Sequence, residues 1–134
     1  MGESQLHQFL KQTAVRSLEA EGFTTYLEPD WSPISLLDWV SYRPDVFAVR
    51  RCCDTDEYAF VECETKPHTS RILDKSTNTI KIQARLMRRT LKRMILTIHS
   101  GTIGCLDLKM RRYWGIWLAN KVNGEVEVIR MLES

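Results

Sequence analysis

The strongest constraint on the fold of this chain is a pair of short apolar runs, each of which adjoins an acidic residue. Asp45 precedes the run 46–49, and Glu62 follows the run 58–61. The polar stretch 50–57 separates the two runs, and this pattern predicts a β-hairpin with its turn in that stretch. Because the runs mirror each other about the turn, a symmetric hairpin places the carboxylates of Asp45 and Glu62 side by side.

The second run leads into a patterned group of charged side chains. Side chains alternate along a strand, so Glu62, Glu64 and Lys66 are expected on one face, with Cys63 on the other. Carboxylates in a cluster repel one another and are stable together mainly when a hard divalent cation lies among them. We therefore expect Asp45 and the two glutamates to bind Mg²⁺ or Mn²⁺, with Lys66 beside a metal-activated water that attacks a phosphodiester.

The rest of the chain predicts a mixture of helices and strands. The spacing of apolar residues predicts one helix over 4–21, stopped at Gly22, and a second over 70–91. Strands are expected at 23–27 and 94–99, a short helix at 103–110, and a second hairpin formed by 114–119 and 126–131. A length of 134 residues is usual for one domain, so we expect a single α/β domain over 1–134.

The acidic motif resembles a known signature. Arg43-Pro44-Asp45, followed after the hairpin by 61–66 (Val-Glu-Cys-Glu-Thr-Lys), is similar to the PD-(D/E)xK motif of the restriction-endonuclease-like nuclease superfamily. In size and layout the chain is most similar to the archaeal Holliday-junction-resolvase-like nucleases. The resemblance covers a core over 3–99 and implies an αβββαβ fold with a mixed central sheet (α+β), to which 100–134 adds the C-terminal β-hairpin. It also implies that the first two acids hold the metal and that the lysine lies next to the water.

Two interpretations of the motif remain open. Taken literally, the pattern of acid, any residue and lysine selects Glu64 and Lys66, whereas the symmetry of the hairpin selects Glu62 as the partner of Asp45. We favour the symmetric interpretation. In it Glu64 occupies the position of the usual lysine, as in family members with an E-x-E pattern. Lys66, two residues later, then supplies the positive charge that the usual lysine would provide.

The resemblance also implies accessory residues outside the motif. Family members often add an acidic or polar residue from the first helix, where Glu3 and His7 share a face. Glu28 closes the first predicted strand and is a candidate ligand for a second metal ion. Gln83 lies on the predicted helix after the motif, where the superfamily often places a polar residue. The alternative for all four is a solvated side chain.

Charge is distributed unevenly along the chain. Residues 1–66 hold 6 Lys/Arg and 12 Asp/Glu, whereas 67–134 hold 13 and 5. Such asymmetry favours a polyanionic partner when bases flank an acidic site. Basic side chains along the predicted second helix are candidate phosphate contacts, although a solvated helix face is an equal alternative. These candidate nucleic-acid-binding residues are Lys81, Arg85, Arg88, Arg89 and Lys92.

Together these patterns predict a Mg²⁺-dependent endonuclease that acts on DNA, of a junction or repair type, and works as a homodimer because cutting two strands usually takes two sites. One alternative is a nuclease-fold subunit that binds nucleic acid without cleaving it. Another is a protein-interaction module that uses the tryptophan-rich C-terminal hairpin, its acids merely solvated. The N-terminus lacks a secretory pattern and no apolar run is long enough for a membrane span, so we expect a cytoplasmic location with free cysteine thiols.

Overall fold

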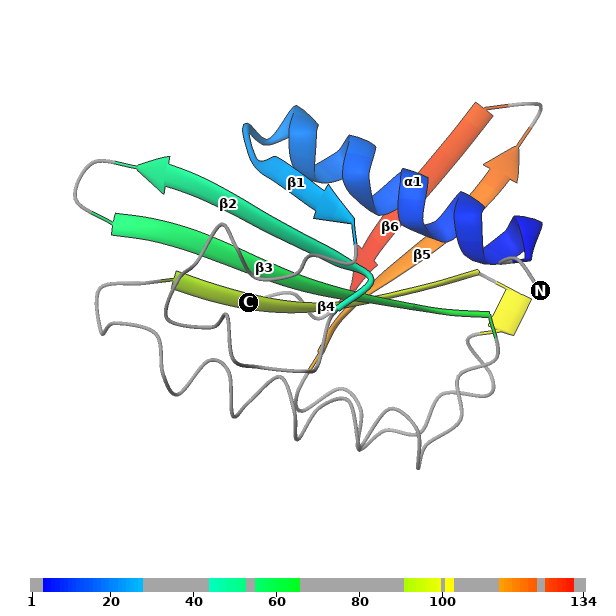
Figure 1. The fold of residues 1–134 in the computed structure, drawn as a ribbon. Helices are drawn as coiled ribbons and strands as arrows, with labels where there is room; N and C mark the ends of the chain where they lie inside the picture. The colour runs from blue at the N-terminus through cyan, green and yellow to red at the C-terminus, as the bar shows by residue number, and fades with distance from the viewer. Residues whose placement is uncertain are drawn as a thin grey trace.

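The computed structural model describes residues 4–27, 44–52, 55–65, 91–99, 101–102, 114–122 and 125–131. Within these ranges one helix packs on a six-stranded mixed sheet, so the fold class is α+β (Figure 1). The second predicted helix, up to residue 90, and the short helix over 103–110 lie outside the described residues. The elements are α1 (Gln5–Ala20), β1 (Thr24–Leu27), β2 (Val46–Cys52), β3 (Thr55–Glu64), β4 (Leu91–His99), β5 (Gly115–Val122) and β6 (Glu125–Met131).

Helix α1 begins and ends where its sequence predicts. The Ser4 hydroxyl accepts a hydrogen bond from the His7 backbone N–H at 3.1 Å, which satisfies a donor in the first turn. The helix ends before Gly22, whose φ of 94° lies in the left-handed region that other residues rarely adopt. The Phe23 N–H then donates to the Leu18 carbonyl at 3.0 Å and directs the chain back into β1.

The strands follow one another across the sheet in chain order, from β1 to β6. The pairs β1–β2, β2–β3 and β5–β6 are antiparallel, whereas β3–β4 and β4–β5 are parallel. The predicted hairpin of 114–119 and 126–131 is confirmed as β5 and β6. Parallel neighbours cannot be joined by a tight turn, so long connections are required both before and after β4.

The predicted β-hairpin is confirmed, but both strands continue into the polar stretch 50–57 as far as the Cys52–Thr55 pair, so the strands are longer than the apolar runs. Its charged residues pair across the two strands. Arg50 lies opposite Glu57 and forms an ion pair with it, and Arg51 Nε lies 3.0 Å from Asp56 Oδ1. Opposite charges on facing strands favour pairing, so these polar residues extend the ladder where the sequence suggested a turn. Asp56 also raises the pKa of the Arg51 guanidinium.

Strand β4 also begins earlier than predicted. It starts at Leu91, which pairs with Glu57, and not at residue 94. The ladder with β3 reaches this far because β3 itself extends back beyond Tyr58. Lys92, expected on a basic helix face, therefore has its backbone in a strand, which corrects that part of the predicted stripe.

The two faces of the sheet carry different cores. Leu10, Ala14 and Leu18 of α1 pack against one face, which we call the α1 face; Figure 1 shows the helix lying across it. Trp114 and Trp117 are both buried, one in each core. The sheet residues of the α1 face are Val46, Ala48, Ala59, Val61, Cys63, Ile95, Trp117 and Ala119, and the second core contains Leu96, Ile98, Trp114, Ile116 and Leu118.

At the C-terminal end of α1, arginine and aromatic side chains alternate across the sheet. The Arg50 guanidinium lies 4.5 Å from the centroid of the Phe23 ring, and Arg93 lies 5.8 Å from the same ring. Arg93 and Arg130 lie 5.9 and 4.3 Å from the Trp117 ring. We call these five residues the arginine ladder. Cation–π contacts of this kind are stabilising where the cation is partly shielded from water.

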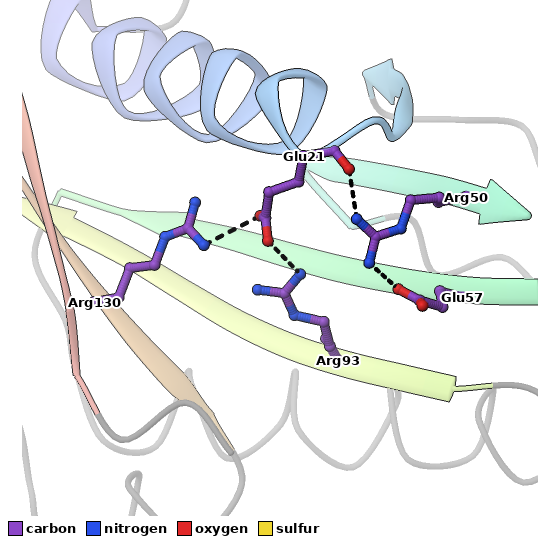
Figure 2. A network of polar contacts seen from close by, with 5 residues as sticks. All are labelled: Glu21, Arg50, Glu57, Arg93 and Arg130. Carbon is purple, nitrogen blue, oxygen red and sulfur yellow. Dashed lines mark hydrogen bonds and ion pairs between the residues drawn. The ribbon is translucent and has the colours of Figure 1, made fainter. Parts of the chain in front are cut away.

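The arginine ladder holds the end of the helix through Glu21 (Figure 2). Arg50 donates to the Glu21 backbone carbonyl, and its other guanidinium nitrogen pairs with Glu57. The Glu21 carboxylate lies 3.5 Å from Arg93 Nη1 and 3.2 Å from Arg130 Nη1. The contact between Arg130 Nη1 and Glu21 Oε2 is an ion pair only. Glu21 Oε2 is buried and accepts no hydrogen bond, from Arg130 or from any other described group.

We expect Glu21→Gln to lower the free energy of unfolding by about 1–2 kcal/mol, mainly because it leaves the half-buried Arg93 without its carboxylate; the exposed Arg130 should contribute less. Arg51→Ala is the matched control. It breaks an ion pair whose arginine is 81% exposed, and should lower the free energy of unfolding much less than Glu21→Gln does. Urea unfolding of both variants measures the difference. Equal losses would show that the arginine ladder contributes no more than an exposed pair.

Candidate functional site

Asp45 lies at the point where the chain enters β2. The first pair of the β2–β3 ladder is Val46 with Val61, so Asp45 lies one step beyond it, in line with Glu62. Its Oδ2 accepts a hydrogen bond from the backbone N–H of Cys63 at 2.8 Å. The first acid of the motif is thus bound to β3 between the positions of Glu62 and Glu64.

A residue of α1 also contacts Asp45. His7 Nε2 lies 3.5 Å from Asp45 Oδ2, and the two side chains are only 22% and 14% exposed. His7 was one of two candidates from the first helix, and the structure places it beside Asp45; Glu3, the other, lies outside the described residues. The Asp45 carboxylate is therefore approached by a main-chain donor of the sheet and by a side chain of the helix.

Glu62 and Glu64 project from the face opposite α1. Their neighbours Val61 and Cys63 belong to the core under the helix, and side chains alternate along the strand. Each glutamate is only 2% exposed. The alternative of solvated acids therefore does not hold for these two side chains, and carboxylates buried to this degree are costly unless polar partners or a cation compensate for lost hydration.

Aromatic rings flank these acids on the same side of the sheet. The Phe47 ring lies 5.7 Å from that of Tyr58 and 5.4 Å from that of Phe60, while Tyr26 stacks on Phe47 at 6.3 Å. Burial, together with the charge of Asp56, raises the pKa of the Tyr58 hydroxyl, which stays neutral well above neutral pH. Glu62 is thus next to an apolar surface, where charge–charge interactions are stronger than in water.

Several predicted site residues cannot be placed. Lys66, Glu28, Gln83 and the basic residues from Lys81 to Arg89 lie outside the described residues. Within the described ranges, no three His, Cys, Asp or Glu side chains are grouped so that they could hold a metal ion. The structure thus joins Asp45 to His7 and to the backbone of Cys63. It does not show Asp45, Glu62 and Glu64 as a preformed set of three ligands.

The anchor of Asp45 is a feature that the sequence does not reveal. The donor is a main-chain N–H, and because almost every residue has one, the residue type does not show which N–H will bind Asp45. The predicted register of the hairpin was the one indication, because it brings Asp45, just before β2, close to Cys63 of β3.

Comparison with known proteins gives no further guide to the site. No family model, curated protein or solved structure matches this chain. The helix that the structure describes, α1, is too short and too polar to cross a membrane.

The Asp45–Cys63 bond makes a prediction about stability. Asp45→Ala should lower the free energy of unfolding by about 1–2 kcal/mol, because it leaves the partly buried Cys63 N–H without its acceptor. Asp45→Asn retains an acceptor oxygen and should lose less than half as much. Chemical denaturation of the two variants tests this. Equal losses would mean that the charge of Asp45 beside His7, and not the hydrogen bond, is what stabilises the fold.

Proposed function

We propose that this chain is a Mg²⁺-dependent endonuclease that hydrolyses DNA phosphodiester bonds, with Asp45, Glu62, Glu64 and Lys66 as its active-site residues. The hydrogen bond from Cys63 N–H to Asp45 Oδ2 carries the proposal, because it brings the first acid of the motif onto the strand that bears Glu62 and Glu64. The burial of both glutamates is compatible with it, since buried carboxylates either pair with polar groups or bind a cation.

The donor set fits Mg²⁺ by its chemistry. Asp45, Glu62 and Glu64 offer only carboxylate oxygens, the ligands that hard cations prefer. Mg²⁺ usually takes one or two protein carboxylates and completes its octahedron with water and substrate phosphate, so a preformed group of three is not required. When bound, the ion would polarise the phosphodiester and lower the pKa of an attacking water.

The chain's own residues would then orient the reaction. The Cys63 N–H fixes the direction of the Asp45 carboxylate, and His7 limits how far that carboxylate can turn. Lys66 follows Glu64 by two positions and would offset negative charge that develops near the water. The apolar rings beside Glu62 exclude bulk water from that side, which strengthens each of these interactions.

The arrangement of the sheet supports membership of the nuclease superfamily. The elements α1, β1, β2, β3 and β4 follow in the order that the αβββαβ core requires. Strands β1 to β3 form an antiparallel meander, and β4 joins β3 in parallel, which demands a crossover connection between them. We propose that this is the restriction-endonuclease-like core, of the type found in junction resolvases.

A second candidate function is a nuclease-fold subunit that binds DNA without cutting it. The contacts of Asp45 favour it, since Oδ2 already meets two protein groups, His7 and the Cys63 N–H, which a cation would have to share. The two functions share a fold and differ only in the chemistry of this site.

Cleavage separates the two functions. With Mg²⁺ or Mn²⁺, we expect wild-type protein to cut one of linear, single-stranded, flap or four-way-junction DNA, and EDTA to stop the reaction. Asp45→Asn and Glu62→Gln should abolish both cleavage and calorimetric metal binding, whereas Lys66→Ala should keep metal binding and slow the reaction at least about 100-fold.

Arg51→Ala, an exposed site distant in sequence from the motif glutamates, is the control and should retain full activity. Loss of cleavage in Glu64→Gln but not in Glu62→Gln would select the literal interpretation of the motif. Full cleavage by Asp45→Asn would contradict the assigned site. An inactive wild type that still binds DNA would favour the second function.

The basic second half of the chain predicts phosphate contacts. Replacing Arg85 and Arg88 by alanine should weaken DNA binding about equally for all sequences and reduce the slope of log affinity against log salt by about 2. Fluorescence anisotropy at several salt concentrations measures both quantities. Unchanged affinity and slope would show that these arginines belong to a solvated surface.

A further inference from the structure

A cleft lies between α1 and the end of β1, which run beside each other in Figure 1. Its volume is about 460 Å³, within the range of about 300–1,000 Å³ that is usual for sites of small ligands. Among the described residues, α1 side chains from Gln8 to Glu19 form one wall, and Leu27 of β1 belongs to the other. The cleft is therefore large enough for a nucleotide.

One end of this cleft adjoins the candidate site at Asp45. Leu27 pairs with Val46, the residue that follows Asp45 in the chain. On the helix, Lys11 lines the cleft one turn after His7, and His7 Nε2 lies 3.5 Å from Asp45 Oδ2. Both walls are therefore continuous with residues that lie at Asp45.

Two charged residues of the lining already have contacts within the protein. Glu19 Oε1 accepts a hydrogen bond from the Thr25 hydroxyl at 2.9 Å, which joins the last turn of α1 to β1. Lys11 is only 7% exposed and also makes a contact within the chain. We therefore count neither residue as a ligand-binding group. Of the charged residues in the described lining, this leaves Arg16, which is exposed.

An exposed stripe of α1 supplies the polar groups of the cleft. Gln8, Gln12 and Arg16 follow at intervals of four residues, so their side chains lie along one side of the helix. Each glutamine amide has donors and an acceptor, and the Arg16 guanidinium is a permanent cation. Leu27, which is 58% exposed, and Val15 add apolar surface. The lining thus combines groups that recognise the edge of a base, its flat faces and a phosphate.

We propose that this cleft binds one unpaired nucleotide of the DNA strand that is cut, beside the scissile phosphate. The inference rests on the proposed nuclease function, which places the scissile phosphate at Asp45. The base packs against Leu27 and Val15, and the two glutamine amides form hydrogen bonds with its edge. The Arg16 guanidinium contacts a neighbouring phosphate of the same strand.

This mode of binding determines the class of substrate. A base whose edge is bonded to protein amides cannot pair with a complementary base at the same time. Arg16 lies nine residues after His7, about 13 Å along the helix, so the phosphate that it contacts is not the one at Asp45. The strand therefore follows α1 from Asp45 towards Arg16. The substrate is DNA with unpaired nucleotides at the point of cleavage, such as a flap or a junction, and not intact duplex.

The test compares two labelled DNA duplexes that differ only in a single-stranded overhang, by fluorescence anisotropy in EDTA. Wild type should bind the overhang duplex about 10-fold more tightly than the blunt duplex. The double variant Gln8→Ala/Gln12→Ala should lose most of this preference and keep its affinity for the blunt duplex. Gln5→Ala is the matched control, because Gln5 is an exposed residue of α1 outside the described lining; it should keep the full preference.

A gain of affinity separates this role from loss of folding. Leu27→Trp offers the base a larger flat surface and should strengthen binding of the overhang duplex by about 5-fold or more, without effect on the blunt duplex. A wild type without preference for the overhang, an equal loss for both duplexes in the double variant, or no gain with Leu27→Trp would overturn the proposal.

The nuclease proposal can fail separately, because binding in EDTA requires neither metal nor cleavage. A wild type that cuts DNA beside a double variant with unchanged preference would remove the nucleotide from the cleft and leave the nuclease function standing. A wild type that cuts no DNA, but whose preference for the overhang is lost in the double variant, would remove the nuclease function and leave the cleft as a site for unpaired nucleotides.

Discussion

One carboxylate, that of Glu21, connects the only helix among the described residues to strands on both halves of the sheet. It lies at the end of α1 and contacts Arg93 of β4 and Arg130 of β6, while its backbone carbonyl accepts from Arg50 of β2. The arginine ladder places these cations on the rings of Phe23 and Trp117. The direction of α1 over the sheet, and with it the place of His7 beside Asp45, therefore depends on contacts made at the opposite end of the helix.

Much of the hairpin could be predicted from the sequence because apolar burial sets strand register. The mirrored runs require Val46 to face Val61, and the structure has that pair. The same logic ended the strands too early at Arg50 and Arg51, since residue polarity alone does not distinguish a solvated turn from charged residues that pair across two strands. The early start of β4 at Leu91 was missed for a related reason, because it follows from the length of β3 and not from any local pattern.

For the candidate site, the sequence could suggest which residues group together but not what each of them contacts. Residue types and spacing suggested that Asp45, Glu62 and Glu64 belong together, but they say nothing about what surrounds each carboxylate. The structure shows Asp45 bound by a main-chain N–H, and it places Glu62 two residues after the aromatic Phe60 on the same strand face. Helical spacing placed His7 on a candidate face, but only the position of the whole helix puts it 3.5 Å from Asp45.

The parallel pairing of β4 with both its neighbours has a consequence for how this chain folds. The pairs β2–β3 and β5–β6 form from segments that are adjacent in the sequence, whereas β4 pairs with β3 and β5 across long intervening segments on both sides. Closing those long loops costs entropy before any contact compensates for it, so insertion of β4 is the slow event of folding. Until β4 is in place, β3 and β5 are themselves open edges, and the nascent protein is most prone to aggregate during that interval.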